Sequence, residues 1–184
     1  LPIFILSPML AGLIMFLPIL IPLMFSNEFL PVVQMAQVSV LAMYLKVMTL
    51  PVAYITLARG YSLSYLFLEA AYAVALVLMV VFGFSHWGIY GTGLAIVGAH
   101  VFDYLLINGY AYWRYQYRCT PTLVFYAIMQ TALGIAAFAT SLLTQGWVYW
   151  TTEAALVMLS TALSVYILHQ KTHLWQSLRS RFGF

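Results

Sequence analysis

Residues 39–72 read SVLAMYLKVMTLPVAYITLARGYSLSYLFLEAAY, two apolar runs joined by a short turn at residues 59–62. Lys46 lies deep in the first run, and Glu69 lies deep in the second. A charge at the centre of an apolar membrane helix costs about 2.5–3.5 kcal/mol on insertion scales, so such a residue usually has a partner or a wet cavity. The stretch therefore predicts a membrane hairpin whose buried charges are either a functional element or a tolerated ion pair.

The composition of the chain is that of a membrane protein. Of 184 residues, 65% are hydrophobic and only 6% are charged, whereas soluble domains carry about 25% charged residues. The net charge of +3 is too small to indicate nucleic acid as a partner. The single cysteine, Cys119, excludes an internal disulfide framework and a cysteine-based zinc site. We therefore expect an all-α, polytopic membrane helix bundle with membrane lipids around it.

Six segments have the roughly 20 mostly apolar residues that a spanning helix needs. Turn residues separate them, including Ser26-Asn27-Glu28, Arg59-Gly60 and a stretch from Gly83 to Gly88. Prolines inside the first two segments predict kinks, because each removes a backbone hydrogen bond. The predicted helices are residues 3–25, 31–57, 63–82, 88–113, 122–143 and 147–169.

Basic residues gather on one side of this predicted bundle. That side holds the second and fourth loops and both chain ends, whereas the opposite side holds Glu28 and Glu153. The positive-inside rule then places the loops near 59–62 and 114–121, together with the chain ends, in the cytoplasm. The basic residues on that side are Arg59, Arg114, Arg118, Lys171, Arg179 and Arg181.

Residues 171–184 form a segment of a different kind. Leu174, Trp175, Leu178 and Phe182 recur at helical spacing, with arginines between them. The pattern predicts a short amphipathic helix lying on the anionic cytoplasmic leaflet. An ordinary positive-inside anchor without lipid specificity is the alternative.

Three neighbouring predicted helices each direct a small or polar face inward, and each face carries an ionisable group. These groups are Lys46, Glu69 and Asp103, and His100 is a further candidate three residues before Asp103. Positions three and four apart share a helix face, and small residues let helices approach closely in lipid. The faces therefore predict a polar cavity. The other polar residues expected to line it are Ser39, Thr49, Thr56, Tyr65 and Tyr72.

The depth of each charged residue indicates which of them can meet. At ~1.5 Å per residue, Lys46 lies roughly 20 Å above the Arg59 turn and Asp103 roughly 16 Å above Arg114. Glu69 lies about 10–15 Å from the same boundary, so it needs a long reach from Lys46 or a separate wet pocket. We therefore expect a Lys46–Asp103 contact. Two roles are open: the pair fixes helix packing only, or Glu69 or Asp103 binds a proton or monovalent cation during transport.

The sequence shows no motif for catalysis, a cofactor or a metal. It has no P-loop and no Ser–His–Asp arrangement, and the glycines of residues 88–93 have the wrong order for a dinucleotide loop. His169 and His173 have a spacing that can chelate a metal on a helix, but no acidic or cysteine partner is near them in the sequence. We therefore expect neither an enzyme, nor a metal site, nor a cofactor.

Several motifs occur in order between about residues 16 and 115. They are PILIPLMF at 18–25, SNEF at 26–29, LKVMTLPVAYITLARGY at 45–61 and WGIYGTGL at 87–94. In this order and spacing they resemble the C-terminal lobe of bacterial O-antigen-type polysaccharide flippases. These proteins belong to the multidrug/oligosaccharidyl-lipid/polysaccharide exporter superfamily. The last two predicted helices match only the extra helix pair that some members carry.

The resemblance implies a transporter of the bacterial inner membrane. Its substrate would be a polyprenyl-linked oligosaccharide, moved from the cytoplasmic to the outer leaflet by alternating access. It would also have an N-terminal lobe, facing this one across a central cavity as internal repeats do. We accordingly expect the 184 residues to form a single transmembrane domain, as a fragment of a longer polypeptide. The resemblance implies no catalytic or phosphate-binding residue here, because much of the family's substrate-contacting charge belongs to helices absent from this sequence.

Three other functions are open. A drug or cation exporter of the same superfamily would favour acidic cavity groups over Lys46. A membrane-embedded glycan polymerase or acyltransferase would need essential polar residues near an aqueous mouth, often in a long loop, and the predicted loops are short. A structural or assembly subunit would tolerate a neutral residue at position 46.

Overall fold

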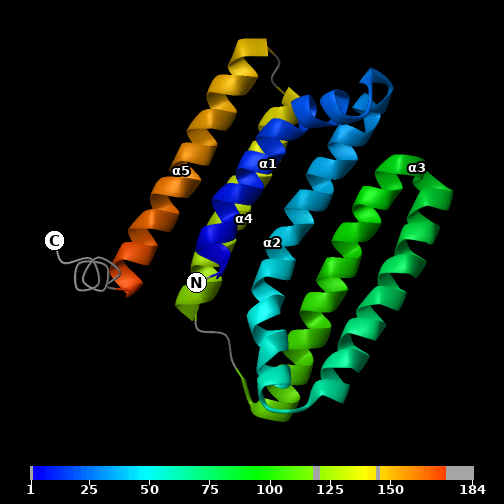
Figure 1. Cartoon of the computed structure of the whole chain (residues 1–184), viewed down its shortest axis with the longest axis vertical. Coiled ribbons are helices and arrows are strands. Elements are labelled where there is room, and N and C mark those ends of the chain that lie inside the picture. Colours follow the sequence, from blue (N-terminus) through cyan, green and yellow to red (C-terminus); the bar gives the residue numbers. More distant parts are fainter. Residues whose placement is uncertain (1, 118–120, 144–145, 173–184) are drawn as a thin grey trace.

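The computed structural model describes residues 2–117, 121–143 and 146–172, which are almost entirely helical. Its elements are α1 (Pro2–Met24), the short 3-10 helix η1 (Asn27–Phe29), α2 (Leu30–Ala58), α3 (Ser62–Tyr115), α4 (Pro121–Leu143) and α5 (Gly146–Thr172) (Figure 1). Each of the five α-helices in these ranges is long and apolar enough to cross a membrane. The expected all-α class is confirmed, and the helices have the length and composition of membrane spans.

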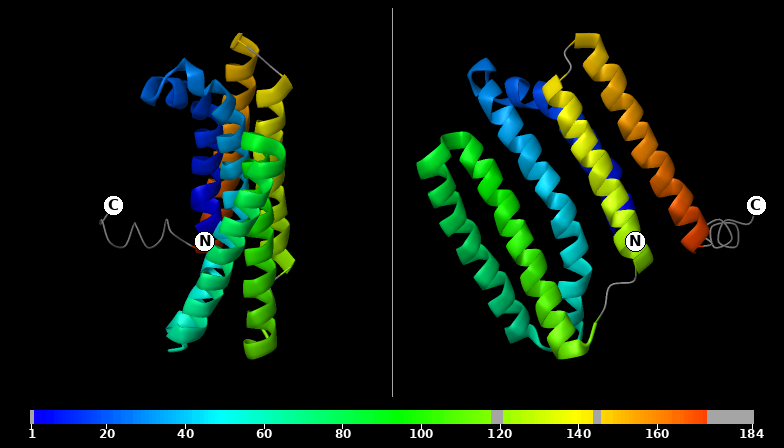
Figure 2. Two further views of the ribbon diagram at one scale, coloured as in Figure 1. Left: turned by 90° about the vertical axis from the view of Figure 1, so that its right-hand side faces the viewer. Right: turned by 180° about the vertical axis from the view of Figure 1, so that it is seen from behind.

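α3 consists of two helical arms, and the chain reverses direction between them at Gly88. The backbone there has φ 60° and ψ −142°, a conformation that essentially only glycine adopts. The two arms that flank Gly88 run antiparallel, as both Figure 1 and Figure 2 show. Close to the bend, a Cβ added to Gly83 would overlap the carbonyl oxygen of Gly91. Glycine therefore permits both the reversal and the backbone contact that follows it.

The two arms of α3 correspond to two of the predicted helices. The segments expected at 63–82 and 88–113 are the two arms of α3, and residues 83–87 between them are helical rather than a linker. Six separate helices are thus not confirmed. The predicted amphipathic helix lies outside the described residues from residue 173 onward, and residues 171–172 continue α5.

α2 is the central helix of the bundle. It packs against α1, α3 and α4, whereas α3 packs against α2 alone among the described helices. α1, α4 and α5 pack against one another on the other side of α2 (Figures 1 and 2). Since lipid supplies no hydrophobic drive between helices, close side-chain packing must hold these faces together. The buried apolar contacts of α2 are Val52 and Ala53 with Ile107 and Ala111 of α3, and Val47 with Phe4, Ala127 and Ile167.

A polar contact between α1 and α2 compensates for a proline. Pro18 has no N–H, so it leaves the carbonyl of Ile14 without its usual helical donor. Gln37 of α2, which is buried, donates its Nε2–H to that carbonyl at 3.1 Å. Ser141 of α4 in turn donates its hydroxyl to Oε1 of Gln37 at 3.1 Å. An unsatisfied backbone group costs several kcal/mol in lipid, so Gln37 stabilises the kinked conformation of α1.

Candidate functional site between α2 and α3

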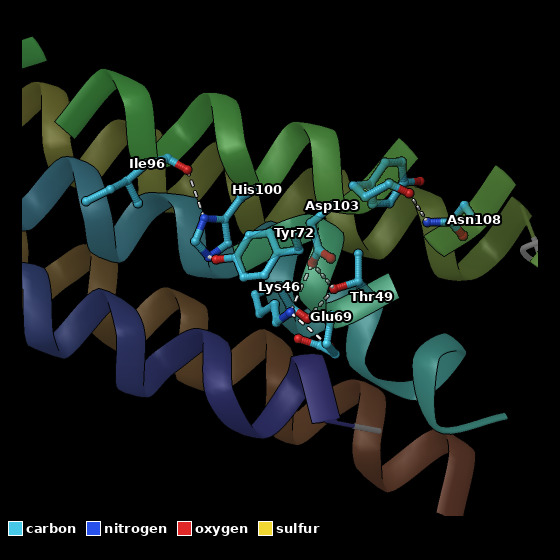
Figure 3. A network of polar contacts seen from close by, with 9 residues as sticks. Lys46, Thr49, Glu69, Tyr72, Ile96, His100, Asp103 and Asn108 are labelled. Carbon is cyan, nitrogen blue, oxygen red and sulfur yellow. Dashed lines mark hydrogen bonds and ion pairs between the residues drawn. The ribbon is translucent and has the colours of Figure 1, made fainter. Parts of the chain in front are cut away.

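Lys46 of α2 lies between two carboxylates from opposite arms of α3 (Figure 3). Its Nζ is 3.1 Å from Oδ2 of Asp103 and 3.5 Å from Oε1 of Glu69. The same Nζ lies 4.3 Å from the centroid of the Tyr72 ring, at a distance where a cation is attracted to the ring face. The Lys46–Asp103 contact expected from helix depth is confirmed. Glu69 also reaches Lys46, so it does not occupy a separate pocket.

The two ion pairs differ in burial. The side chain of Asp103 is 0% exposed, that of Lys46 is 18% exposed and that of Glu69 is 29% exposed. Asp103 is thus the inner, closer partner of Lys46, and Glu69 is the outer, more distant one. With all three groups ionised, the cluster has one excess negative charge. Glu69 is the carboxylate best placed to exchange its partner for a proton or a cation.

Thr49 supports the inner carboxylate. Its hydroxyl lies 3.2 Å from Oδ2 of Asp103 and 3.0 Å from the carbonyl oxygen of Lys46, one turn earlier on α2. The other carboxylate oxygen of Asp103, Oδ1, is buried without a hydrogen-bond partner. Asp103 therefore keeps unused acceptor capacity inside the bundle, next to the Lys46 ammonium.

His100 extends the network along the second arm of α3. Its Nδ1 lies 2.8 Å from the carbonyl oxygen of Ile96, an acceptor, so this nitrogen carries the hydrogen. In a neutral ring Nε2 is then an acceptor, and Tyr72 donates its hydroxyl to it at 3.4 Å. His100 is buried and, in these hydrogen bonds, is paired with Tyr72 and its own helix rather than with Asp103. The Tyr72 ring thus connects the Lys46 charge to the imidazole (Figure 3).

The other predicted cavity residues are placed elsewhere. Ser39 donates to the carbonyl of Met35 in its own helix at 2.9 Å. Tyr65 stacks on Tyr54 with ring centroids 6.3 Å apart. Thr56 is buried near the end of α2. Within the hydrogen bonds of the described residues, only Thr49 and Tyr72 of the five predicted lining residues belong to the Lys46 network.

The two acidic residues assigned to the outer side differ in burial. Glu153, assigned to the outer side together with Glu28, is fully buried inside the bundle, whereas Glu28 is exposed. Oγ1 of Thr140 in α4 lies 2.6 Å from Oε1 of Glu153. The signal was present in the sequence, because Glu153 falls seven residues after Gly146, the first residue of α5. That distance corresponds to about 10 Å along the helix.

A second set of missed polar residues lies between α4 and α5. Gln130 donates Nε2–H to the Ser164 hydroxyl at 3.0 Å, and Ser160 donates its hydroxyl to Oε1 of Gln130 at 2.8 Å. All three are buried. Interhelical hydrogen bonds of this kind hold helices together in lipid. The spacing of Glu153, Ser160 and Ser164 on a single face of α5 is the sequence signal for this interface.

Two arginines near the α2–α3 turn stack on tyrosines. The guanidinium of Arg59 lies 4.6 Å from the Tyr115 ring centroid, and that of Arg114 lies 5.3 Å from the Tyr61 ring centroid. Arg59 and Tyr61 lie in the turn before α3, and their partners lie at its C-terminal end. These cation–π contacts therefore connect the start of α3 with its end. The exposed positive charge of these arginines lies at the end predicted to face the cytoplasm.

No protein-family model matches this chain, and neither the curated proteins nor the solved structures contain one with significant similarity to it. The class is therefore defined by the fold and the site: the described residues form helices suited to span a membrane, and a partly buried Lys–Asp–Glu cluster lies between two of them.

Proposed function

We propose that this chain forms one wall of a membrane transporter that moves a polyprenyl-linked oligosaccharide from the cytoplasmic to the outer leaflet by alternating access. The observation that carries the transporter assignment is the cluster of Lys46, Asp103 and Glu69 between α2 and the two arms of α3. Ionisable groups inside membrane helices are costly, and they mark substrate or ion pathways more often than surface charges do. The choice of cargo rests on the order of the motifs between residues 18 and 94.

The proposal assigns an orientation and a second lobe. The turn at 59–61 and the end of α3, which carry Arg59 and Arg114, face the cytoplasm of a bacterium, and the bundle lies in the inner membrane. An N-terminal lobe of the same polypeptide faces this one across the transport cavity, as paired repeats do in other transporters.

The packing of α3 gives alternating access a structural basis. α3 contacts α2 alone among the described helices, so α3 can move relative to α1, α4 and α5 through a change at its interface with α2 only. At that interface the Lys46–Asp103 pair, whose carboxylate is fully buried, stays closed, and the Lys46–Glu69 pair is the contact that opens. Opening it frees an ammonium and a carboxylate for cargo or for a coupling proton or monovalent cation.

A cation exporter is the second candidate, and the charge of the cluster favours it. Two carboxylates surround a single ammonium. Once one carboxylate is paired with Lys46, the other is available for a cationic substrate. The same preparation of protein can therefore be given a cationic dye as an alternative cargo.

The test is transport by the complete polypeptide in phospholipid vesicles. A fluorescent polyprenyl-linked oligosaccharide is added, and its leaflet is read with a membrane-impermeant quencher. Glu69→Gln should abolish flipping while protein level and insertion stay normal. Glu28→Gln is the matched control, because Glu28 is exposed outside the cluster.

Three results would contradict the proposal. Normal flipping by Glu69→Gln would make the cluster a packing element. Loss of insertion with Glu69→Gln would also favour a structural role. Transport of the cationic dye without transport of the glycan lipid would replace the first candidate with the second.

A further inference from the structure

Glu153 is the buried acid that the Lys46 cluster does not use. It projects from α5 toward Thr140 of α4 and is 0% exposed. Oε1 lies 2.6 Å from the Thr140 hydroxyl oxygen, while Oε2 is buried without a hydrogen-bond partner. The carboxyl group thus has a single close polar contact at one oxygen and none at the other.

Hydrogen counting at Thr140 indicates where a proton lies. The hydroxyl oxygen is 2.9 Å from the carbonyl oxygen of Ala137 and 2.6 Å from Oε1 of Glu153. A hydroxyl carries one hydrogen, and a carbonyl can only accept. If Thr140 donates to Ala137, the short contact to Glu153 is a hydrogen bond only when the carboxyl supplies its own hydrogen. Both contacts are then satisfied at the same time.

The surroundings of Glu153 contain no counter-ion in the described part of the chain. α1 has no titratable side chain, and the only one in α4 is Tyr126, fourteen residues or about 21 Å along the helix from Thr140. On α5, Tyr149 donates its hydroxyl to the carbonyl of Met15 at 2.9 Å. The remaining titratable residues of α5 are Tyr166, His169 and Lys171, all at least thirteen residues from Glu153.

The α2 side chain that is hydrogen-bonded to α4 beside Thr140 is the neutral Gln37, and the hydroxyl of Tyr44, which packs against Gly134 of α4, donates to the carbonyl of Ser7 in α1. Oε1 of Gln37 accepts a hydrogen bond from the Ser141 hydroxyl. The cation of α2 is Lys46, which lies nine residues after Gln37 and is paired with Asp103. An ionised carboxylate buried without a partner is so unfavourable that such a group neutralises instead. The absence of a nearby cation therefore agrees with the hydrogen count at Thr140.

We propose that Glu153 is a proton-binding site of this protein, separate from the Lys46 cluster. In this conformation the proton is bonded to Oε1 and donated to the Thr140 hydroxyl oxygen, whose own hydrogen goes to the carbonyl of Ala137. Loss of the proton requires water or a cation to reach the buried carboxylate. Deprotonation is thus coupled to separation of α4 from α5. The proposal is independent of the cargo and holds for any function of the α2–α3 cluster.

Infrared spectroscopy of the full chain in phospholipid vesicles at neutral pH tests the proposal. A carboxylic-acid C=O stretch should be present and should disappear in Glu153→Gln, which keeps a hydrogen-bonding group toward Thr140. It should persist in Glu28→Gln, since Glu28 is exposed. An unchanged acid band in Glu153→Gln, with loss of carboxylate bands instead, would show that Glu153 is ionised and would overturn the proposal.

A second variant tests the assigned hydrogen bond without removing the acid. Thr140→Val deletes the acceptor, so the acid band of Glu153 should move to higher frequency. A band at the original frequency would show that the proton is not donated to Thr140.

Dicyclohexylcarbodiimide, which modifies protonated carboxyls in apolar surroundings, gives a chemical check by mass spectrometry. Glu153 should be modified in Thr140→Val, and Glu28 should not. Labelling of Glu28 with none at Glu153 would count against a bound proton.

Discussion

Tyr44 of α2 lies against Gly134 of α4 so closely that a Cβ at position 134 would be 2.8 Å from Cε2 of the ring. On its other side, Tyr44 donates its hydroxyl to the carbonyl oxygen of Ser7 in α1 at 3.0 Å. The side chain is almost fully buried. Because it is fixed by contacts with two helices, the ring cannot move aside for a larger neighbour. α1, α2 and α4 thus meet around a single side chain.

Gly134→Ala should therefore destabilise the protein by about 1–3 kcal/mol, the usual cost of overpacking a well-packed core. Thermal unfolding in mild detergent, followed by tryptophan fluorescence, measures the change. Gly109→Ala is the matched control, because Gly109 is also in a helix and a Cβ there meets nothing within 4 Å. Alanine is a better helix former than glycine, so the control should be neutral or stabilised by up to about 1 kcal/mol. Equal unfolding temperatures for the two variants would contradict the contact.

The unequal burial of the two carboxylates predicts unequal effects on stability. Asp103→Asn breaks a buried ion pair and should cost about 3–5 kcal/mol. Glu69→Gln breaks a longer, partly exposed contact and should cost no more than about 1 kcal/mol. Urea or thermal unfolding of both variants in the same detergent gives the comparison. A larger loss for Glu69→Gln would mean that Glu69 is the structural partner of Lys46.

The Gln37–Ile14 hydrogen bond predicts a coupling between Gln37 and Pro18. Gln37→Leu leaves the carbonyl of Ile14 unsatisfied and should cost about 1–3 kcal/mol. In a Pro18→Ala background the backbone N–H of residue 18 is restored, so the same substitution should cost less. A double-mutant cycle of unfolding free energies measures the difference. Additive losses would show that Gln37 does not compensate for the proline.

The reversal of α3 predicts a strict requirement for glycine at position 88. Gly88→Ala places a side chain at φ 60° and ψ −142°, which should cost about 1–3 kcal/mol in stored backbone strain. Gly98→Ala is the comparison, because Gly98 has ordinary space, with Met79 Sδ 3.5 Å from the added Cβ. Unfolding temperatures rank the two variants. Tolerance of Gly88→Ala would mean that the arms do not reverse at that residue.

Two features could be predicted from the sequence because each depends on local, additive geometry. Long apolar runs identify helices suited to a membrane, and a constant rise per residue placed Lys46 and Asp103 at similar depths. The position of Glu69 was harder to predict, since a lysine side chain can reach across a difference in depth that helix positions alone leave open. Both carboxylates therefore share Lys46.

The remaining features depend on tertiary contacts that the sequence pattern does not reveal. Gly88 signals a break, but helical residues continue on both sides of it up to the turn. The charge of Glu153 placed it on the outer side with Glu28, but the sequence pattern does not show that it is buried against Thr140 of α4. Gln37 donates a hydrogen bond to the carbonyl of Ile14, which Pro18 leaves without its helical donor. A contact between residues of two different helices cannot be predicted from the hydrophobic periodicity of either one.

The contacts of α2 also imply an order of assembly during synthesis. Lys46 contacts Glu69 and Asp103, which lie only 23 and 57 residues downstream, so the α2–α3 interface can close as soon as α3 has been synthesised. The hydrogen bond between Gln37 and Ser141 forms only after 104 more residues have been synthesised. The one between Met15 and Tyr149 needs 134 more residues. Until then the proline-kinked α1 lacks its partners on α4 and α5. A nascent chain arrested after α3 should therefore hold a closed ion cluster beside an α1 helix that proteases can still cleave.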